Sequence, residues 1–295
     1  MTAAMDRTTD RRTGAVLTTL LSSLMLGTSY VAVKMTVGAV NPFLLGAATM
    51  AVGSAVLLAY MVLKGLLDPG MLKRWEFWAG PIINIGVVAP SYVGLTMTTA
   101  SAAGLIIGTN VVFVALFSRI LFQERLGRRR TLGLGIALLG LITLTTRWDL
   151  TVLDGSRMTG NLLVLLSAVC IGISVVTSRI ALRSLSAEQW SLSLHLLLPP
   201  ALLALYFIVP MDGGLSSADL PAALFIGVVC TTVPTVLWTS ALRHISVVTS
   251  ATILMVESAF AVFLSWILLG EVIDAYVVTG AMMIFAAILL MARSE

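Results

Sequence analysis

The sequence predicts an all-α membrane protein of ten transmembrane helices, arranged as two inverted five-helix repeats with both termini in the cytoplasm. Composition is the first observation behind this prediction: of 295 residues, 58% are hydrophobic and only 11% are charged, and the mean hydropathy is +1.02. A soluble domain carries roughly 25% charged residues, so this chain has too little polar surface to coat a globule. We therefore expect membrane lipid to be its main surroundings, and a multi-pass protein of the cell (inner) membrane.

The second observation is a series of ten apolar segments, each close to the roughly 20 residues that a membrane span needs. Turn-forming residues separate them, such as Asn41-Pro42 and Asp154-Gly155. The segments account for almost the whole chain, so no soluble domain is expected. The predicted helices cover residues 14–35, 43–64, 77–97, 100–122, 131–147, 159–181, 190–209, 220–241, 247–269 and 274–292.

The distribution of Lys and Arg predicts the orientation of the helices. With the N-terminus in the cytoplasm, 14 of the 18 Lys and Arg residues fall on inner segments and three, Lys34, Arg147 and Arg157, fall on the outer side. Cytoplasmic loops of membrane proteins are enriched in these residues, so this bias predicts both termini inside. The cations lie in short clusters between apolar stretches, so the net charge of +4 does not indicate nucleic-acid binding.

The third observation is a sequence repeat. GTSYVAVK at residues 27–34 is echoed by GISVVTSR at residues 172–179, which lies 145 residues later, and each stretch ends in a cation, Lys34 or Arg179. Chance apolar similarity would not place a charge at the matching position. We expect these two side chains to extend to opposite interfaces of the membrane.

A second pair of motifs supports the same repeat. LFQERL matches LLGEVI, which places Glu124 and Glu271 147 residues apart. A unit of five spans has an odd number of crossings, so the second copy enters the membrane from the opposite side. Inverted repeats of this kind are typical of secondary transporters, whose substrate site lies near the midplane between the halves. The predicted parts are an N-terminal tail at 1–13, a first repeat at 14–148, an extracytoplasmic linker at 149–158 and a second repeat at 159–295.

Three stretches carry a resemblance to a known family: GTSYVAVK, TTASAAGLIIGTNVVFVALFSRILFQERL at residues 98–126 and SVVTSATILMVESAFAVFLSWILLGEVI at residues 246–273. With them, the chain resembles the EamA-type branch of the drug/metabolite transporter superfamily over essentially its whole length. Within that branch it is similar to the YddG-like exporters of aromatic amino acids. The resemblance implies a ten-helix fold and the export of small metabolites.

The chain departs from that family at several positions. The family often has a proline where this chain has Val111 in the fourth helix and Ser258 in the ninth, so kinks at those points must arise from other residues or be absent. The frequent arginine of the second helix is also missing, because Thr49 and Met50 stand there. A substrate role tied to that arginine does not carry over.

Polar side chains inside the predicted spans are the candidates for a substrate site, because such residues are costly in lipid. Glu257 is the acid that lies deepest, about midway along the ninth helix. It could bind a substrate ammonium or carry a proton, and equally it could be a structural acid hydrogen-bonded between helices. Asn110 holds the repeat-equivalent place in the fourth helix, so these two side chains are predicted to approach one another.

Helical spacing supplies the other candidates. Asn84 and Ser91 of the third helix are seven residues apart and share a face. Trp238 fits a cavity wall or an interfacial anchor that faces lipid, and Ser174, like Gly104-x-x-x-Gly108, also suits close helix packing. The predicted gate or structural residues are Pro90, His195 and Pro234. The predicted substrate-binding residues are Tyr30, Asn84, Ser91, Tyr92, Asn110, Ser174, Trp238 and Glu257.

Together these features predict a secondary transporter that exports small apolar metabolites, above all aromatic or neutral amino acids, by alternating access around a midplane cavity. A broad-specificity drug or metabolite exporter of the same fold is the alternative. A channel would need rings of repeated charge, and an intramembrane enzyme would have only His195 and His244 as histidine bases. We expect no enzyme activity, no cofactor, no metal and no nucleic-acid partner. The substrate is expected to be a small molecule, with facilitation favoured over proton coupling, and the oligomeric state is open, with a monomer expected.

Overall fold

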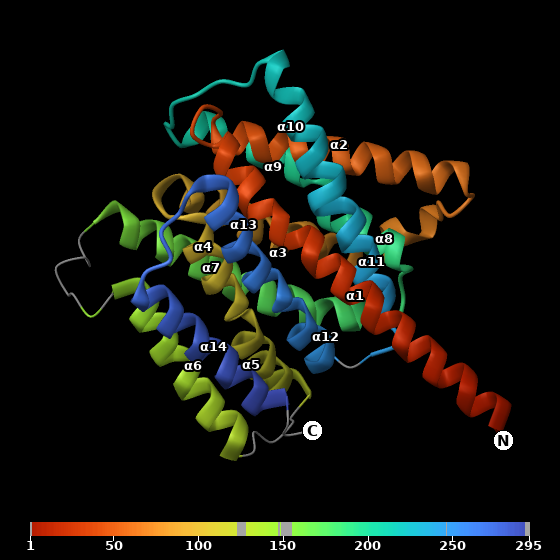
Figure 1. Ribbon diagram of the computed structural model, residues 1–295. Helices are drawn as coiled ribbons and strands as arrows, with labels where there is room; N and C mark the ends of the chain where they lie inside the picture. Colours follow the sequence, from red (N-terminus) through yellow and green to blue (C-terminus); the bar gives the residue numbers. More distant parts are fainter. Residues whose placement is uncertain (1, 123–127, 147, 149–154, 246, 293–295) are drawn as a thin grey trace.

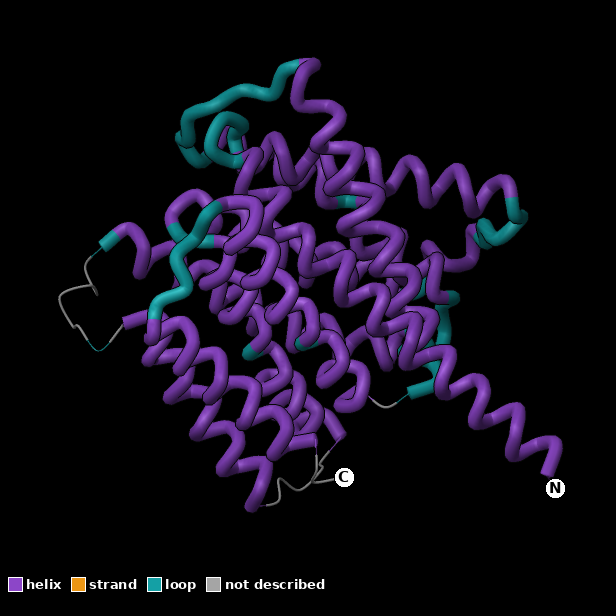
Figure 2. Tube along the Cα trace, in the orientation of Figure 1, coloured by secondary structure: helices purple, strands orange, loops and turns teal. Residues whose placement is uncertain are grey.

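The computed structural model describes residues 2–122, 128–146, 148, 155–245 and 247–292, and these form helices joined by short loops, without a β-strand (Figure 2). Glu124, Arg147 and residues 149–154 of the predicted linker lie outside the described residues. Figure 1 shows the start of helix α1 and the end of helix α14 on the lower side of the molecule. The cytoplasmic placement of both termini stays a prediction.

The helices of the first half begin at α1, which is continuous from Thr2 and therefore includes most of the predicted tail. Asn41 caps the second helix, because its side-chain oxygen accepts hydrogen bonds from the backbone N–H groups of Phe43 (2.9 Å) and Leu44 (3.3 Å). A 3₁₀ turn at Pro69–Lys73 precedes the third helix. The helices are α1 Thr2–Thr36, α2 Pro42–Leu63, α3 Trp75–Met97, α4 Ala100–Gly108, α5 Asn110–Phe122 and α6 Arg128–Thr146.

The second half follows the same plan with more interruptions. A π-helical stretch, Phe225–Thr232, separates α10 from α11, and the hydroxyl of Thr231 donates to the carbonyl of Ile226 five residues back (2.8 Å). The helices are α7 Ser156–Ala181, α8 Ala187–Leu196, α9 Leu198–Ile208, α10 Leu220–Leu224, α11 Val233–Ala241, α12 Val247–Leu254, α13 Val256–Leu269 and α14 Ala275–Ala292.

Eight helical segments of the described chain are long and apolar enough to cross a membrane. The predicted fifth and tenth spans correspond to shorter apolar helices, Thr131–Thr143 and Ala275–Ala287. They lie within α6 (19 residues) and α14 (18 residues), which pack side by side (Figure 1). At 1.5 Å per residue these two helices are about 27–28 Å long, close to the roughly 30 Å of the hydrocarbon core. The eight are Arg12–Thr36, Pro42–Leu63, Trp75–Met97, Ala100–Leu121, Ser156–Ala181, Ala187–Ile208, Ser217–Ala241 and Thr249–Leu269.

The fourth and ninth spans are each broken in the middle, although neither carries the proline that the resemblance led us to look for. The fourth breaks at Thr109, between α4 and α5, and the ninth breaks at Met255, between α12 and α13. Bonds to the residue three back tighten the backbone there: Thr109 N–H donates to Ile106 (3.0 Å), and Ser258 N–H donates to Met255 (3.0 Å). The Thr109 hydroxyl also donates to the Ile106 carbonyl (2.6 Å). The two breaks fall at repeat-equivalent places, so the interruption belongs to the repeated unit.

The two halves pack by exchanging equivalent helices. Helix α1 lies against α13, and its repeat equivalent α7 lies against α5. The matching contacts use matching residues: a Cβ added at Gly27 would lie 3.3 Å from the Cβ of Phe260, and a Cβ at Gly172 would lie 2.5 Å from the Cβ of Phe113. Glycine is required at both crossings for this close approach. Such reciprocal contacts are what two repeats related by a pseudo-twofold axis produce.

Two predictions made for single residues have different outcomes. Gly104 contacts Ala261 and Gly108 contacts Ser258, so the close packing predicted for these glycines is confirmed. The expectation that Lys34 and Arg179 extend to opposite membrane interfaces stays a prediction. Each donates to a backbone carbonyl near the C-terminal end of another helix, where carbonyls lack intrahelical donors.

Candidate functional site

A cavity of about 190 Å³ lies between the two halves and is lined by helices from both. Its walls come from α1, α2, α3, α4 and α5 of the first half, and from α7, α8, the π-helical stretch, α11, α12 and α13 of the second. Pro90 and Pro234 are not among the lining residues. The lining includes all eight residues predicted to bind substrate, and also His195: Tyr30, Asn84, Ser91, Tyr92, Asn110, Ser174, His195, Trp238 and Glu257.

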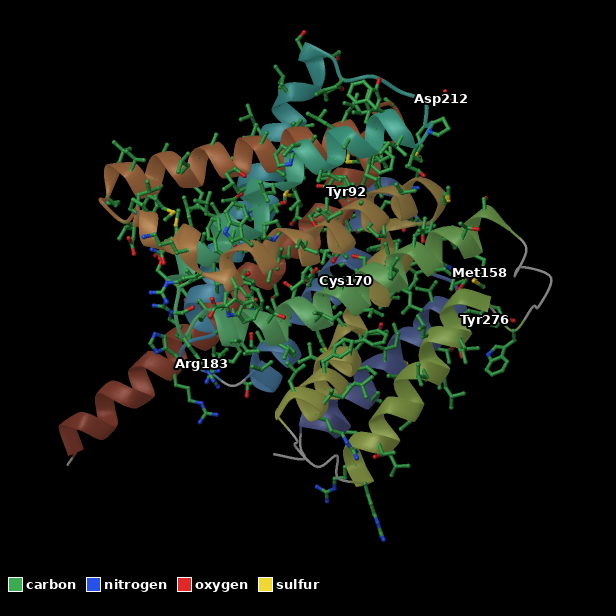
Figure 3. The ribbon with its side chains drawn as sticks, turned by 180° about the vertical axis from the view of Figure 1, so that it is seen from behind. Tyr92, Met158, Cys170, Arg183, Asp212 and Tyr276 are labelled. Atoms are coloured by element: carbon green, nitrogen blue, oxygen red, sulfur yellow. The ribbon has the colours of Figure 1, made fainter. Side chains whose placement is uncertain are left out.

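Figure 3 gives the position of this region in the molecule. Tyr92, on α3, and Cys170, on α7, lie near the middle of the molecule, whereas Arg183, Asp212 and Tyr276 lie toward the edges of the molecule. Helices α3 and α7 pack against each other along their length. The cavity is therefore central, and the predicted functional roles of its lining residues stay predictions.

Glu257 lies in the first turn of α13, directly after the break at Met255, and is 8% exposed. The hydroxyl of Tyr30, on α1, donates to Oε1 of Glu257 (2.5 Å), and Tyr30 itself is 7% exposed. The break brings this carboxylate to the start of a helix, where the backbone dipole favours negative charge. Glu257 is therefore hydrogen-bonded between helices and faces the cavity at the same time.

Asn110 is the first residue of α5 and follows the break at Thr109. Its side chain is 7% exposed, and within the described structure its buried Oδ1 has no hydrogen-bond partner. Buried amide oxygens are nearly always paired, so an unpaired one that lines a cavity points to a ligand or water as its missing partner. Asn110 and Glu257, although 147 residues apart, line the same cavity at repeat-equivalent positions.

The wall formed by α3 is partly committed to internal contacts. The side-chain amide of Asn84 donates to the carbonyl of Leu194 in α8 (2.7 Å), so it links two lining helices. The hydroxyl of Tyr92 lies 3.4 Å from that of Thr49 in α2. Met50, where the resembled family often has an arginine, lines the cavity with an apolar side chain.

Trp238 belongs to the cavity wall and not to the lipid-facing surface. It is 7% exposed, and its indole N–H donates to the hydroxyl of Ser250 in α12 (2.8 Å). His195, at the end of α8, is 1% exposed and also lines the cavity. The interfacial-anchor interpretation of Trp238 is therefore wrong, because its ring is enclosed by α11 and α12.

Some lining residues were not among the candidates that the sequence suggested. Thr235 lies four residues after Thr231, so both share a face of the eighth span, and that spacing could have identified it. Cys230 and Ser167 gave no such signal, since small residues in membrane helices mostly serve packing. The hydroxyl of Thr235 donates to the carbonyl of Thr231 (2.7 Å), and that of Ser167 donates to Val87 (2.7 Å).

The charge of the cavity is uneven. Among the described residues that line it, Glu257 is the one acid and none is a lysine or arginine. The rest of the lining is mostly aliphatic or aromatic, with a few hydroxyl and amide groups. A concave, largely apolar space with a small number of directed polar groups is typical of a small-molecule site.

A family model described as the EamA-like transporter family matches residues 13–146 and, a second time, residues 158–293. The chain belongs to the EamA-like transporter family. This EamA-family protein is a multi-pass membrane transporter that carries the family's domain twice, which agrees with the internal repeat and with the paired helix breaks. Its cargo is therefore a small molecule, and its surroundings are membrane lipid.

Comparisons with individual proteins agree with the family. The transporter is 23% identical over 274 residues to the uncharacterized transporter YoaV of Bacillus subtilis, which covers 90% of this chain and 92% of that protein. It is 24% identical over 277 residues to an uncharacterized transporter of Clostridium kluyveri, covering 90% and 88%. A solved crystal structure shares the fold, with a TM-score of 0.67 over 95% of this chain and 99% of that one, at 19% identity.

Proposed function

We propose that this EamA-family transporter exports small apolar metabolites across the cell membrane, above all aromatic and neutral amino acids. The observation that carries the proposal is the cavity built from both repeats, with one carboxylate in a mostly apolar described lining. In this proposal ten helices span the membrane as two inverted sets of five, and both termini are cytoplasmic. The double family match supports two repeats, and eight of the ten predicted spans meet the length and hydropathy that a crossing needs.

The size and the chemistry of the cavity favour a substrate of amino-acid size. Its volume of about 190 Å³ is below the roughly 300–1,000 Å³ of pockets that hold drug-sized ligands. Glu257 supplies an acceptor for an ammonium group, and the unpaired amide oxygen of Asn110 supplies a second acceptor in the same cavity. The rings of Tyr92 and Trp238 offer apolar surface for the substrate side chain. The same volume argues against a broad-specificity drug exporter.

Alternating access follows from the paired helix breaks. The breaks at Thr109 and Met255 divide the fourth and ninth spans beside Asn110 and Glu257, which face the cavity. Broken helices at the midplane of inverted repeats let each half tilt about a fixed binding site. The cavity would thus open to one side of the membrane at a time while its polar groups keep their places.

The experiment that tests the proposal is transport by purified protein in liposomes. Radiolabelled phenylalanine and a radiolabelled sugar phosphate are offered separately, and a panel of unlabelled amino acids competes with phenylalanine. We expect saturable phenylalanine transport, inhibited by tryptophan, tyrosine and leucine. Transport of the sugar phosphate alone would overturn the proposal, because the cavity has no described cation to neutralise a phosphate.

Coupling is tested in the same liposomes. With one acid in the described lining and no lysine or arginine for a relay, we propose facilitated transport. Collapse of an imposed pH gradient should leave phenylalanine flux unchanged, and the Glu257→Gln variant should retain downhill flux. Loss of flux in both tests would show proton antiport through Glu257 instead.

A further inference from the structure

We propose that the cavity binds primary amines that lack a carboxylate, such as aromatic monoamines, more tightly than the amino acids with the same side chain. The inference rests on the proposed function, because it concerns the same cavity. It goes further by naming the charge of the preferred substrate. Its basis is the pairing of one buried carboxylate, on Glu257, with a lining that supplies no described lysine or arginine.

The carboxylate of Glu257 has little internal compensation. Its Oε1 accepts one hydrogen bond, from the neutral hydroxyl of Tyr30 (2.5 Å). A buried charge is costly unless an opposite charge accompanies it. A substrate ammonium in the cavity would supply that charge, and its remaining N–H groups could reach the unpaired Oδ1 of Asn110. The two repeat-equivalent residues would then hold one ammonium between them.

The described lining offers a substrate carboxylate no lysine or arginine. Its one imidazole is that of His195, whose buried Nδ1 has no hydrogen-bond partner within the described structure. Lys34 and Arg179 belong to the helices α1 and α7 that line the cavity, but both donate to backbone carbonyls and neither is among its lining residues. Neutral donors are also partly engaged: the amide of Asn84 donates to Leu194 and the indole of Trp238 donates to Ser250.

Neutral donors remain for the carboxylate, but they do not cancel its charge. The hydroxyls of Ser91 and Ser174 and the amide of Asn110 line the cavity. A carboxylate held by them would be desolvated within the same small cavity as Glu257, where like charges repel. The ammonium of a zwitterion therefore gains binding free energy from Glu257, and its carboxylate loses binding free energy. A monoamine has the gain without the loss.

Three ligands with the same phenyl ring and two-carbon arm isolate the charge: phenethylamine, phenylalanine and 3-phenylpropionate. Their affinities for the purified full-length protein are measured by isothermal titration calorimetry at neutral pH. We expect phenethylamine to bind about tenfold more tightly than phenylalanine, as a gain of one charge-assisted interaction implies. We expect 3-phenylpropionate to bind most weakly.

Two variants and one control test the cause of the preference. Glu257→Gln should abolish the advantage of phenethylamine over phenylalanine. Tyr30→Phe keeps the charge of Glu257 and should keep the advantage, which covers the case in which Glu257→Gln fails to fold. Asp212→Asn, in an exposed loop, is the control and should bind all three ligands as the natural chain does.

The outcomes separate this inference from the function on which it rests. Phenylalanine binding as tightly as phenethylamine, or an amine advantage that survives in a folded Glu257→Gln variant, overturns the inference and leaves amino-acid export standing. Absence of binding by all three ligands overturns both. Loss of the amine advantage in Tyr30→Phe also overturns the inference, since the charge would then not be the cause.

Discussion

The two ends of the helix bundle, one near Lys34 and the other near Arg179, are built on the same repeated backbone but held by different chemistry. At the first, the ammonium of Lys34 donates to the carbonyls of Leu95 (2.7 Å) and Thr98 (2.6 Å), at the C-terminal end of α3. At the second, the guanidinium of Arg179 donates to the carbonyl of Leu242 (2.6 Å), at the end of α11. Leu95 and Leu242 are 147 residues apart, so the same contact has been kept twice.

Around this shared contact, the Lys34 end is polar. The carboxylate of Glu271 accepts hydrogen bonds from the backbone N–H of Ala100 (2.7 Å) and Ser101 (2.9 Å) and from the hydroxyl of Ser101. It therefore caps α4 from the far half of the chain. The hydroxyl of Thr98 donates to Oδ1 of Asn161 in α7 (2.5 Å). Three segments thus hold the short connection between α3 and α4.

One part of the Arg179 end is apolar where the Lys34 end is polar, as far as the described residues show. Ile245 stands at the repeat equivalent of Thr98, and Val16 stands at that of Asn161. Both belong to a small hydrophobic cluster with Ala15 and Ala241. The hydrogen bond across the first end is replaced here by apolar packing in the same place.

This difference shows how an inverted repeat can keep one geometry and still distinguish the two sides of a membrane. Hydrogen bonds are directional and costly to leave half-made, whereas apolar contacts tolerate sliding and volume-conserving exchange. Helix packing at the Lys34 end should therefore hold one defined arrangement, whereas helix packing at the Arg179 end should tolerate substitutions better. Stability measurements on the two ends can break or sharpen this comparison.

The largest effect should come from Glu271→Ala. The change leaves two backbone N–H groups of α4 and the hydroxyl of Ser101 without their acceptor. We expect a loss of about 2–4 kcal/mol in the free energy of unfolding, measured as a fall in the thermal midpoint of detergent-solubilised protein. Asp212→Asn, at an exposed loop, is the control and should leave the midpoint unchanged. An equal thermal midpoint for both variants would show that the cap formed by Glu271 does not stabilise the Lys34 end.

The second prediction concerns Thr98 and Asn161. Thr98→Val keeps the shape of the side chain but leaves the buried Oδ1 of Asn161 without its donor, so we expect a loss of about 1–2 kcal/mol. Adding Asn161→Leu should restore much of that loss, because both partners are then apolar, as they are at the Arg179 end. Thr36→Val is the control, since the Thr36 hydroxyl bonds only to the carbonyl of Ala32 in its own helix (2.8 Å).

A double-mutant cycle on the same thermal midpoints measures this coupling. Strictly additive losses for Thr98→Val and Asn161→Leu would mean that the hydrogen bond between α3 and α7 does not hold this end. A restored midpoint would show that the polar end can be converted to the chemistry of its repeat equivalent.

Sequence reasoning reached the cavity because polar residues are scarce in these spans. Glu257 and Asn110 stand out as polar residues at equivalent points of two apolar helices, and both line the cavity. Thr235 was not predicted to line the cavity, because a threonine in a membrane helix is usually interpreted as a packing residue. Its hydroxyl bonds to the carbonyl of Thr231 in its own span. The identity of the lining could thus be predicted where polarity was unusual and not where it was common.

The features that sequence reasoning missed depend on backbone groups. Of the breaks at Thr109 and Met255, neither contains a proline, and only the one at Thr109 has a glycine beside it, Gly108. At both breaks the backbone forms local bonds to the residue three back. Lys34 and Arg179 were predicted to extend to the interfaces, but their bonds to carbonyls at the ends of neighbouring helices were not predicted. Such acceptors are invisible in a sequence, because every residue carries one and only tertiary packing decides which are free.

The smallest expected effect compares the two cations directly. Lys34→Met removes the donor to two carbonyls, and Arg179→Met removes the donor to the carbonyl of Leu242. The lysine variant should therefore lose about 1 kcal/mol more. Methionine keeps the length and the apolar stem of both side chains, which isolates the hydrogen bonds. Lys64→Met, an exposed residue at the end of α2, corrects for the loss of a positive charge. Equal midpoints for the two variants would show that the ends differ in their neighbours and not in their cations, because the extra carbonyl at the Lys34 end would then add nothing.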